Sequence, residues 1–376
     1  MHIGFDAKRF FHNPTGLGNY ARSTVLGLAL HYPQHRYILY NARGSEGSCT
    51  ISAKADLVVH EACPLGRVVP ALWRTFGIPR AAEADSLDIF HGLSHELPLT
   101  RFARRTRTVV SMHDLLFLTH PHLYPWLDRH IYALKYKVSC QRADLVVAIS
   151  QKTAEDVHNL FGIPWERIRV AYQSCAEIFS RPIDRAELDR VRRTHALPGD
   201  YVLFVGSLVA RKGVQTLVAA LAEIPASSRP GLVIVGTGPL EESLRAQVRA
   251  LGLEAWTRFA GRVQDEALAA LYRMATVFVY PSVGEGFGIP ILEALHSRVP
   301  VITSTGSCFT EPGGDAALYT TPGDVTELAK TIDRVMGDQS LRQSMIARGL
   351  AQAEKFQPSR TSARLMDVYA ELGPSR

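Results

Sequence analysis

Two glutamates and three glycines lie close together in the stretch 281–296, which is the part of the sequence best suited to chemistry. The apolar run before it predicts a strand that is buried on both faces. Gly284, Gly286 and Gly288 allow the backbone to turn tightly and to approach a ligand closely. Pro290 favours the first turn of a helix. The stretch therefore predicts a strand, a glycine loop and a helix N-terminus, whose free N–H groups can bind an anion.

The two carboxylates of this stretch are placed to approach one bound molecule from different sides. Glu285 lies in the glycine loop, and Glu293 falls about one turn into the predicted helix. Each also has an ordinary structural explanation. Glu285 could be a solvated loop residue, and Glu293 could simply interact favourably with the helix dipole.

The whole string from Pro281 to His296 resembles the motif of retaining glycosyltransferases of GT-B fold. These belong to glycosyl transferases group 1, the large family that includes sucrose synthase and bacterial mannosyl- and glucosyltransferases. The resemblance implies that Glu285 contacts the donor sugar and that Glu293 holds the ribose hydroxyls. It also implies that the backbone of this loop meets the donor diphosphate, at Gly286, Phe287, Gly288 and Ile289.

A second candidate cluster is the cation pair Arg211-Lys212, which follows the predicted strand 201–205 and precedes Gly213. Adjacent cations there would stabilise the negative charge that develops on a departing diphosphate. In the family that Pro281–His296 resembles, a basic pair performs this role, although many members have Gly-Arg where this chain has Gly206-Ser207. The alternative is an ordinary surface pair.

The glycines of Thr15-Gly-Leu-Gly-Asn-Tyr-Ala21 almost fit a dinucleotide-binding fingerprint. They lie some ten residues past the predicted strand end, however, and the second strand ends in Asn41 instead of an acid. The segment resembles instead the N-terminal glycine loop of the glycosyltransferase family. That resemblance implies that Gly16 and Gly18 border the donor phosphate and the acceptor. Thr15 stands where the family usually has its first glycine.

Four further residues lie at or just past the ends of predicted strands. The resemblance implies that His113 hydrogen-bonds the transferred sugar and that the backbone of Val263 meets the nucleotide base, which leaves the identity of the base open. His91 also ends a strand, but a single histidine is more often a structural residue. Asp6 either faces the site or caps the local backbone.

Short apolar strands alternate with helical patterns along the whole chain, which indicates parallel βαβ units and doubly wound sheets. We expect an α/β protein of GT-B fold, in which two Rossmann-like domains with doubly wound parallel sheets face a central cleft. The expected N-terminal, acceptor-side domain spans 1–180, and the expected linker spans 181–200. The expected donor-binding domain spans 201–358. By resemblance, the C-terminal helix within 359–376 packs back on the first domain.

The 376 residues suffice for two domains that each bury a core, and 46% apolar with 21% charged residues is typical of a globular protein. Five cysteines without a CxxC pair argue against a disulfide framework or a zinc site. We see neither a signal-peptide pattern nor an apolar run long enough to cross a bilayer. We therefore expect a cytoplasmic protein, or one that is peripheral on the inner face of the cytoplasmic membrane.

Positive charge is concentrated in the first half of the chain. Residues 1–180 hold 20 Lys and Arg against 15 Asp and Glu, a net +5, whereas the remainder holds 22 against 21, a net +1. The densest patches are 101–107 and 129–137. They form either a solvated basic face or a surface for anionic lipid, with Leu72, Trp73 and Phe76 inserted. Nucleic acid fits worse as a partner and is not expected, because no recognised motif is present and acids are interspersed with the bases.

The resemblance covers nearly the whole chain and implies transfer of a hexose, of mannose or glucose type, with retention. The donor would be a GDP- or UDP-hexose, used as a substrate, and no cofactor or metal is expected because no Asp-x-Asp or metal-ligand cluster is present. The acceptor would be a glycan or lipid-linked glycan of a surface polysaccharide. Alternatives are a nucleotide-sugar epimerase, a phosphorylase, a non-catalytic nucleotide-sugar sensor and a glycosidase. The last would require carboxylates on opposite sides of the scissile bond.

Overall fold

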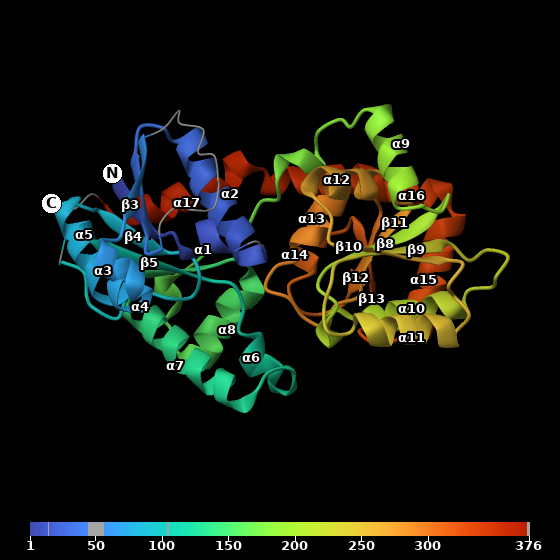
Figure 1. Cartoon of the computed structure of the whole chain (residues 1–376), viewed down its shortest axis with the longest axis horizontal. Helices are drawn as coiled ribbons and strands as arrows, with labels where there is room; N and C mark the ends of the chain where they lie inside the picture. Colours follow the sequence, from blue (N-terminus) through green and yellow to red (C-terminus); the bar gives the residue numbers. More distant parts are fainter. Residues whose placement is uncertain (14, 44–55, 104, 374–376) are drawn as a thin grey trace. The chain divides into compact units, whose positions relative to one another are not determined.

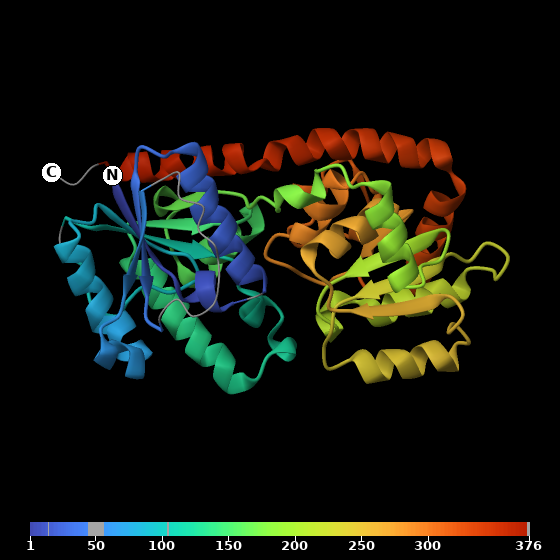
Figure 2. The same ribbon diagram turned by 45° about the horizontal axis from the view of Figure 1, so that its top comes forward.

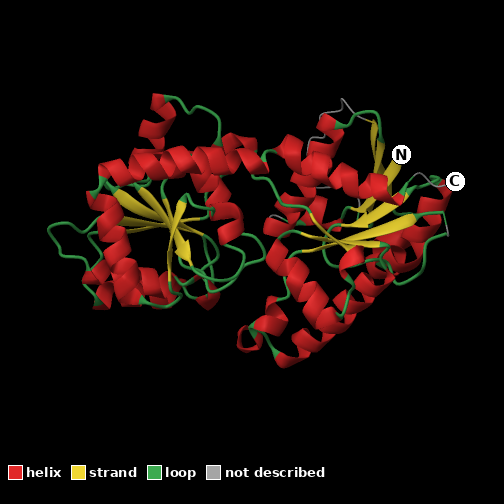
Figure 3. Cartoon of the chain, turned by 180° about the vertical axis from the view of Figure 1, so that it is seen from behind, coloured by secondary structure: helices red, strands yellow, loops and turns green. Residues whose placement is uncertain are grey.

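The computed structural model describes residues 1–13, 15–43, 56–103 and 105–373, and the chain forms two compact units. Unit 1 comprises Met1–Ser174 and Gln357–Arg376, and unit 2 comprises Cys175–Phe356. Each unit contains one parallel sheet with helices on both of its faces (Figure 3). The α/β architecture expected from the alternating pattern is confirmed.

Unit 1 is built on a seven-stranded sheet whose strands lie in the order β3-β2-β1-β4-β5-β6-β7. All its described strand pairs are parallel. The strands are β1 (His2–Asp6), β2 (Arg36–Asn41), β3 (Asp56–Glu61), β4 (Ile89–Gly92), β5 (Arg107–Met112), β6 (Leu145–Ala148) and β7 (Ile168–Val170). Strand β7 has only three residues, which are too few to show an apolar period.

The helices of unit 1 include one that comes from the far end of the chain. They are α1 (Lys8–His12), α2 (Gly16–His31), α3 (Pro64–Val68), α4 (Pro70–Leu72), α5 (Ile78–Ala84), α6 (Leu116–Thr119), α7 (Trp126–Arg142), α8 (Gln151–Phe161) and α17 (Pro358–Leu372). The turn η1 (Trp73–Gly77) joins α4 to α5. Helix α17 packs along α2, as the red and blue helices of Figure 2 show.

A buried hydrogen-bond chain ties α17 to the sheet of unit 1. The Tyr369 hydroxyl and His91 Nδ1 lie 2.6 Å apart, and His91 Nε2 lies 2.8 Å from Ser111 Oγ. The chain continues to the Tyr20 hydroxyl, 2.7 Å from Ser111 Oγ. All four side chains are buried. Because both of its ring nitrogens are occupied, His91 is a structural residue.

Unit 2 is built on a six-stranded sheet whose strands lie in the order β10-β9-β8-β11-β12-β13. The strands are β8 (Tyr201–Val205), β9 (Gly231–Val235), β10 (Thr257–Gly261), β11 (Val277–Tyr280), β12 (Val301–Ser304) and β13 (Ala317–Thr320). Strand β8 is the one predicted at 201–205, and β11 is the strand predicted before the glycine loop. The two residues before Val301, one of them a proline without an N–H, fall outside the ladder.

Unit 2 also contains the segment 181–200 that was predicted as a linker, part of which forms α9 (Arg185–Thr194). The other helices are α10 (Val214–Glu223), α11 (Glu241–Ala250), α12 (Asp265–Met274), α13 (Ile289–His296), α14 (Thr310–Gly313), α15 (Val325–Gly337) and α16 (Gln339–Ala353). Helix α9 begins at Arg185, because Asp184 caps it by accepting a hydrogen bond from the Glu187 amide at 2.8 Å. In the described part of the chain, no helix combines the length and apolar character that a bilayer crossing needs.

Candidate active site

The two motifs whose side chains are best suited to chemistry lie at the centre of the unit 2 sheet. Strands β8 and β11 pair with each other, and the chain connects outward from them in opposite directions. The carboxyl ends of such neighbouring strands form the usual ligand crevice of an open α/β sheet. Arg211 and Lys212 follow β8, and Glu285 follows β11, so the fold brings the predicted cations and the predicted carboxylate together.

A glycine makes the close approach of the two loops possible. Gly213 has a φ of 68°, and a Cβ atom at this position would lie 2.1 Å from the carbonyl oxygen of Pro281. Any other residue would therefore collide with the backbone that leaves β11. The same contact holds Arg211 next to the glycine loop, since the Val283 amide donates to the Arg211 carbonyl at 2.8 Å.

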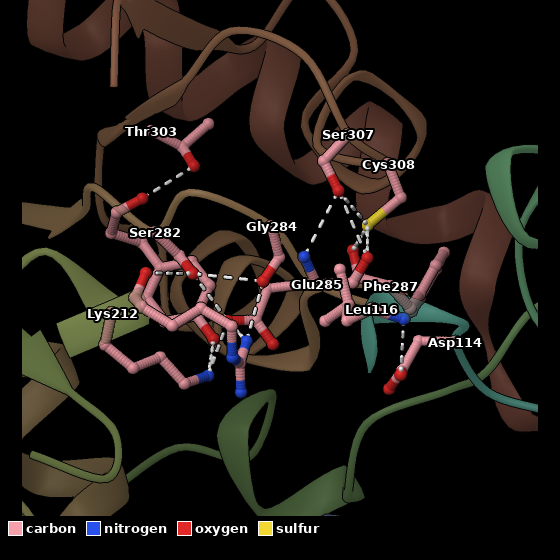
Figure 4. Close-up of polar contacts among 12 residues, drawn as sticks. Asp114, Leu116, Lys212, Ser282, Gly284, Glu285, Phe287, Thr303, Ser307 and Cys308 are labelled. Atoms are coloured by element: carbon pink, nitrogen blue, oxygen red, sulfur yellow. Dashed lines mark hydrogen bonds and ion pairs between the residues drawn. The ribbon is translucent and has the colours of Figure 1, made fainter. Parts of the chain in front are cut away.

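Glu285 is held by both cations (Figure 4). One of its carboxylate oxygens lies 2.5 Å from Arg211 Nη1 and 2.7 Å from Lys212 Nζ. The same oxygen accepts a hydrogen bond from Ser282 Oγ at 2.6 Å. Arg211 Nη1 also donates to the Gly284 carbonyl at 2.6 Å, and Lys212 donates to the Tyr280 hydroxyl. Two cations and one carboxylate leave a net positive charge at the crevice.

The carboxylate of Glu285 stays ionised near neutral pH. Burial alone would raise the pKa of Glu285, but Lys212 and Arg211 outweigh it and lower the pKa to about 2. Burial lowers the pKa of Lys212 from its ordinary value, and the neighbouring Glu285 opposes this shift. A group with a lowered folded-state pKa stabilises the fold above its unfolded value. The contribution of Glu285 is therefore lost only as the pH falls from about 4.5 to about 2.

Four further residues support Glu285 and its loop. Ser307 Oγ accepts from the Glu285 amide at 3.1 Å, and the Cys308 thiol donates to the carbonyls of Glu285 and Phe287, at 3.2 and 3.0 Å (Figure 4). Ser282 and Tyr280 contribute the side-chain contacts already described. Ser282 had a visible signal, since it is a polar residue directly between a buried strand and a glycine loop. Cys308 had none.

The glycine loop enters α13 in the manner predicted. Gly288 is the N-cap of this helix with a φ of 104°, and no side chain caps the first turn. Pro290 lies in that turn, as expected. The Phe287 side chain is buried against the ring of Phe356, with ring centroids 5.6 Å apart. Together with Gly286 and Ile289, this backbone forms a helix N-terminus adjacent to the cation cluster, which suits an anionic ligand.

Glu293 lies one turn into α13 in a different environment. One of its oxygens accepts the Tyr272 hydroxyl at 2.8 Å. Burial raises the pKa of Glu293 to about 7, although the Tyr272 hydrogen bond acts in the opposite direction. Further hydroxyl donors, such as the two hydroxyls of a ribose, would lower the pKa of Glu293 and favour its ionised form.

Val263 follows β10 and lines a surface depression of unit 2 together with Ile178 and Ile183. The depression continues along α9 and the start of α12, past Arg190 and Glu266. Val263 is half-exposed. The backbone contact to the base, which the family resemblance implies, stays a prediction.

His113 lies in unit 1, just past the end of β5, and is buried. Its Nε2 lies 2.8 Å from the Leu93 carbonyl, which can only accept, so Nε2 carries the proton. Burial and the neighbouring His95 lower the pKa of His113 to about 3. The ring is therefore neutral at physiological pH, and its Nδ1 is the atom that can accept a hydrogen bond from a hydroxyl.

The N-terminal glycine loop has the geometry that its sequence required. Gly18 lies in the first turn of α2, and a Cβ atom there would meet the Asn13 carbonyl oxygen at 1.8 Å. Gly16 is exposed and has open space around it. Thr15 is extended, with φ −103° and ψ −173°, so the absence of the family's first glycine imposes no strain.

Asp6, which was a candidate for the site or for a local cap, performs the cap. Its Oδ1 accepts the Lys8 amide at 3.0 Å, and its Oδ2 accepts from Arg74 Nε at 2.7 Å. Asp114 likewise orients its own loop, because it accepts the Leu116 amide at 3.2 Å. Across the described ranges, no three His, Cys, Asp or Glu residues are grouped so that they could hold a metal ion.

Comparison with known proteins places this geometry in a family. The sequence model of glycosyl transferases group 1 matches residues 186–352, and that of glycosyltransferase family 4 matches residues 15–174. The O-antigen chain mannosyltransferase B of Escherichia coli is 34% identical over 289 residues, which is 76% of this chain and 74% of that relative. The chain belongs to the glycosyl transferases group 1 family.

Other relatives of this glycosyltransferase differ in length or are distant in sequence. The serotype-specific mannosyltransferase WbdA of Escherichia coli is 27% identical over 75% of the chain, but the match spans only 36% of that longer protein. The structure of Anabaena HepE in complex with UDP and glucose aligns with a TM-score of 0.76 at 19% identity, over 99% of this chain and 100% of that one. The two Rossmann-like units are therefore those of the GT-B fold.

Proposed function

We propose that this glycosyltransferase moves a hexose of mannose or glucose type from a nucleoside diphosphate to an acceptor hydroxyl, with retention of the anomeric configuration. The observation that carries the proposal is the cluster of Arg211, Lys212 and Glu285 at the carboxyl ends of β8 and β11, next to the N-terminus of α13. A diphosphate needs positive charge and amide donors; the cluster offers the charge, and the N-terminus of α13 beside it offers backbone amides.

The bond changes in the proposed reaction are simple. The bond between the sugar C1 and the diphosphate oxygen breaks, and C1 forms a new bond to the acceptor oxygen on the same face. The acceptor proton passes to an oxygen of the departing diphosphate. Arg211, Lys212 and the first turn of α13 stabilise the charge that grows on this leaving group. Since these groups supply the positive charge, we propose that the reaction needs neither a metal ion nor a cofactor.

The remaining predicted residues hold the donor. Glu285 is ionised and can stabilise the sugar as positive charge develops at C1. Glu293 would accept hydrogen bonds from the ribose hydroxyls, and the backbone of Val263 would contact the base. His113, through its unprotonated Nδ1, would accept a hydroxyl of the sugar.

Relatives guide the choice of substrates. The name of the Escherichia coli O-antigen chain mannosyltransferase favours a mannosyl donor and a surface-polysaccharide acceptor, and the HepE complex contains UDP and glucose. We therefore propose a GDP- or UDP-hexose donor and a glycan or lipid-linked glycan acceptor, with Gly16 and Gly18 at the acceptor side. Such an acceptor would place the enzyme in the cytoplasm, in peripheral contact with the inner face of the cytoplasmic membrane.

Product analysis tests the proposal. Purified enzyme is incubated with GDP-mannose, UDP-glucose or UDP-galactose and with octyl α-mannoside, and the new linkage is assigned by NMR. We expect an α-linked product from one α-configured donor, at the same rate with and without a chelator. A β-linked product would refute retention. Epimerised nucleotide sugar, or free hexose without transfer, would refute the transferase assignment for these substrates.

A further inference from the structure

His95 has a backbone conformation that few side chains adopt. Its φ is 66°, in the left-handed region, where residues other than glycine are uncommon. The residue lies in the loop between β4 and β5, two neighbouring strands of unit 1 (Figure 1). Its amide donates to the carbonyl of Ser111 in β5 at 2.9 Å, which holds the loop against that strand. Backbone strain of this kind persists only where the surrounding contacts enforce it, and it is concentrated at functional sites.

The imidazole ring of His95 is fixed by two other rings and by a backbone amide. It stacks on Tyr136 of α7, with ring centroids 4.5 Å apart and planes 12° from parallel. It meets the ring of His113 in a T-shaped contact, with centroids 4.9 Å apart. The His113 amide donates to His95 Nε2 at 3.2 Å. Only 7% of His95 is exposed, so these contacts hold the ring in one orientation.

The same contacts decide which nitrogen of His95 carries the proton. A backbone amide can only donate, so Nε2 is unprotonated and the proton is on Nδ1. Burial and, to a smaller extent, Arg9 lower the pKa of His95 to about 3, so the ring is neutral at physiological pH. Among the described residues, none accepts a hydrogen bond from His95 Nδ1. His91, in contrast, has a partner at both of its ring nitrogens.

His113 is the complement of His95. Its Nε2 donates to the Leu93 carbonyl, and its unprotonated Nδ1 accepts from no residue that the structure describes. The two neighbouring rings therefore offer one N–H donor and one nitrogen acceptor, and both side chains are buried. Buried polar groups are nearly always hydrogen-bonded, so the two unpaired nitrogens indicate a polar ligand. A sugar suits them, because each of its hydroxyls can donate and accept.

We propose that His95 is a specificity-determining residue, which donates a hydrogen bond from Nδ1 to a hydroxyl oxygen of the transferred hexose. The inference rests on the proposed function, in which His113 Nδ1 accepts a hydroxyl proton of that same sugar. A site built to hydrogen-bond a hydroxyl rejects an analogue without it, because the buried N–H is then left without an acceptor. His95 thereby makes the enzyme selective for a hexose that carries this hydroxyl.

The test measures Kd by isothermal titration calorimetry, without an acceptor sugar. The ligands are GDP-mannose, UDP-glucose, UDP-galactose and the 2-, 3-, 4- and 6-deoxy analogues of each. For the donor that the wild type binds, we expect one deoxy analogue to bind about tenfold more weakly than the parent. His95→Gln keeps an amide oxygen near the position of Nε2 but has no donor at the position of Nδ1. Its preference for the parent over that analogue should fall below about threefold.

The matched control is His95→Asn. The side-chain nitrogen of Asn is attached to Cγ, as Nδ1 of His is, and Asn tolerates the left-handed conformation. The control should therefore keep the preference for the parent, although it loses the acceptor for the His113 amide. A merely structural role would weaken the parent and the analogue equally in both variants. Equal preference in the wild type and in His95→Gln, or no penalty for any deoxy analogue in the wild type, would overturn the proposal.

The same titrations separate this inference from the proposed reaction. A wild type that discriminates as expected but transfers no sugar to octyl α-mannoside would refute only the reaction. A wild type that transfers sugar but binds every deoxy analogue as tightly as the parent would refute only the role of His95. A wild type that binds none of the three nucleotide sugars would overturn both for these substrates.

Discussion

The two glutamates of this site have pKa values that are shifted in opposite directions. Two adjacent cations lower the pKa of Glu285 to about 2, whereas burial beside a single tyrosine hydroxyl raises the pKa of Glu293 to about 7. Their environments thus separate a permanently charged carboxylate from one that titrates near physiological pH. The roles proposed for them, on the sugar and on the ribose, are consistent with this difference.

Glu293 makes a measurable contribution to the pH dependence of stability. Its folded-state pKa is raised, so its stabilisation is complete below about pH 4.5 and is lost as the pH rises through about 7. Between about pH 5 and about pH 8, the wild type should lose on the order of 2 kcal/mol of unfolding free energy relative to Glu293→Gln. Urea denaturation of both proteins at the two pH values checks this. Parallel pH profiles would show that Glu293 does not titrate as stated.

At the scale of elements, the sequence predicted the strands, the glycine loop and the start of α13 because each depends on neighbouring residues. It could not predict the ion pairs of Glu285 with Arg211 and Lys212. Those pairs require β8 to lie next to β11, and strand order is not visible in a local pattern. Helix α7 illustrates a second limit, because Leu127, Ile131 and Leu134 on one of its faces are exposed. Periodicity identifies the apolar face of a helix, but the pattern is the same whether that face is buried or exposed.

The loop contact at Gly213 should be essential for the cation cluster. Gly213→Ala places a methyl group against the Pro281 carbonyl and also occupies a φ of 68°. Gly252→Ala is the matched control, since its φ is 65° but no atom lies within 4 Å of the added Cβ. We expect the control to lose about 1 kcal/mol of unfolding free energy, from the backbone alone.

Gly213→Ala should lose at least about 2 kcal/mol more than the control, because the added methyl group meets backbone that cannot relax freely. It should also lose its response to nucleoside diphosphates. Thermal unfolding with and without the ligand measures both effects. Equal stability of the two alanine variants would show that the approach of the loops is not tight.

At the scale of the whole molecule, the C-terminal segment leaves unit 2 and completes unit 1. Tyr369 of α17 hydrogen-bonds His91, and Arg169 pairs with Glu371 of the same helix at 2.7 Å. Burial lowers the pKa of His91 to about 3, so the ring is neutral and needs a partner at each nitrogen. Unit 1 therefore depends on residues from both ends of the sequence.

Removing the Tyr369 hydroxyl tests this dependence. Tyr369→Phe leaves His91 Nδ1 buried without a partner, which should cost about 1 to 3 kcal/mol of unfolding free energy. Tyr132→Phe, at a half-exposed position of unit 1, should change it by less than about 0.5 kcal/mol. Chemical denaturation followed by circular dichroism compares the two. A Tyr369→Phe protein as stable as the Tyr132→Phe control would refute the role of the buried chain.

We propose that unit 2 binds a nucleoside diphosphate sugar through Arg211, Lys212 and Glu293. The most direct test is thermal unfolding with UDP, GDP, ADP and their hexose conjugates, on the wild type, on Arg211→Gln/Lys212→Gln and on Glu293→Gln. One diphosphate should stabilise the wild type by about 2.7 kcal/mol at a hundred times its Kd. Both variants should show a much smaller shift. A wild type that responds to no nucleotide, or variants that respond as it does, would contradict the account.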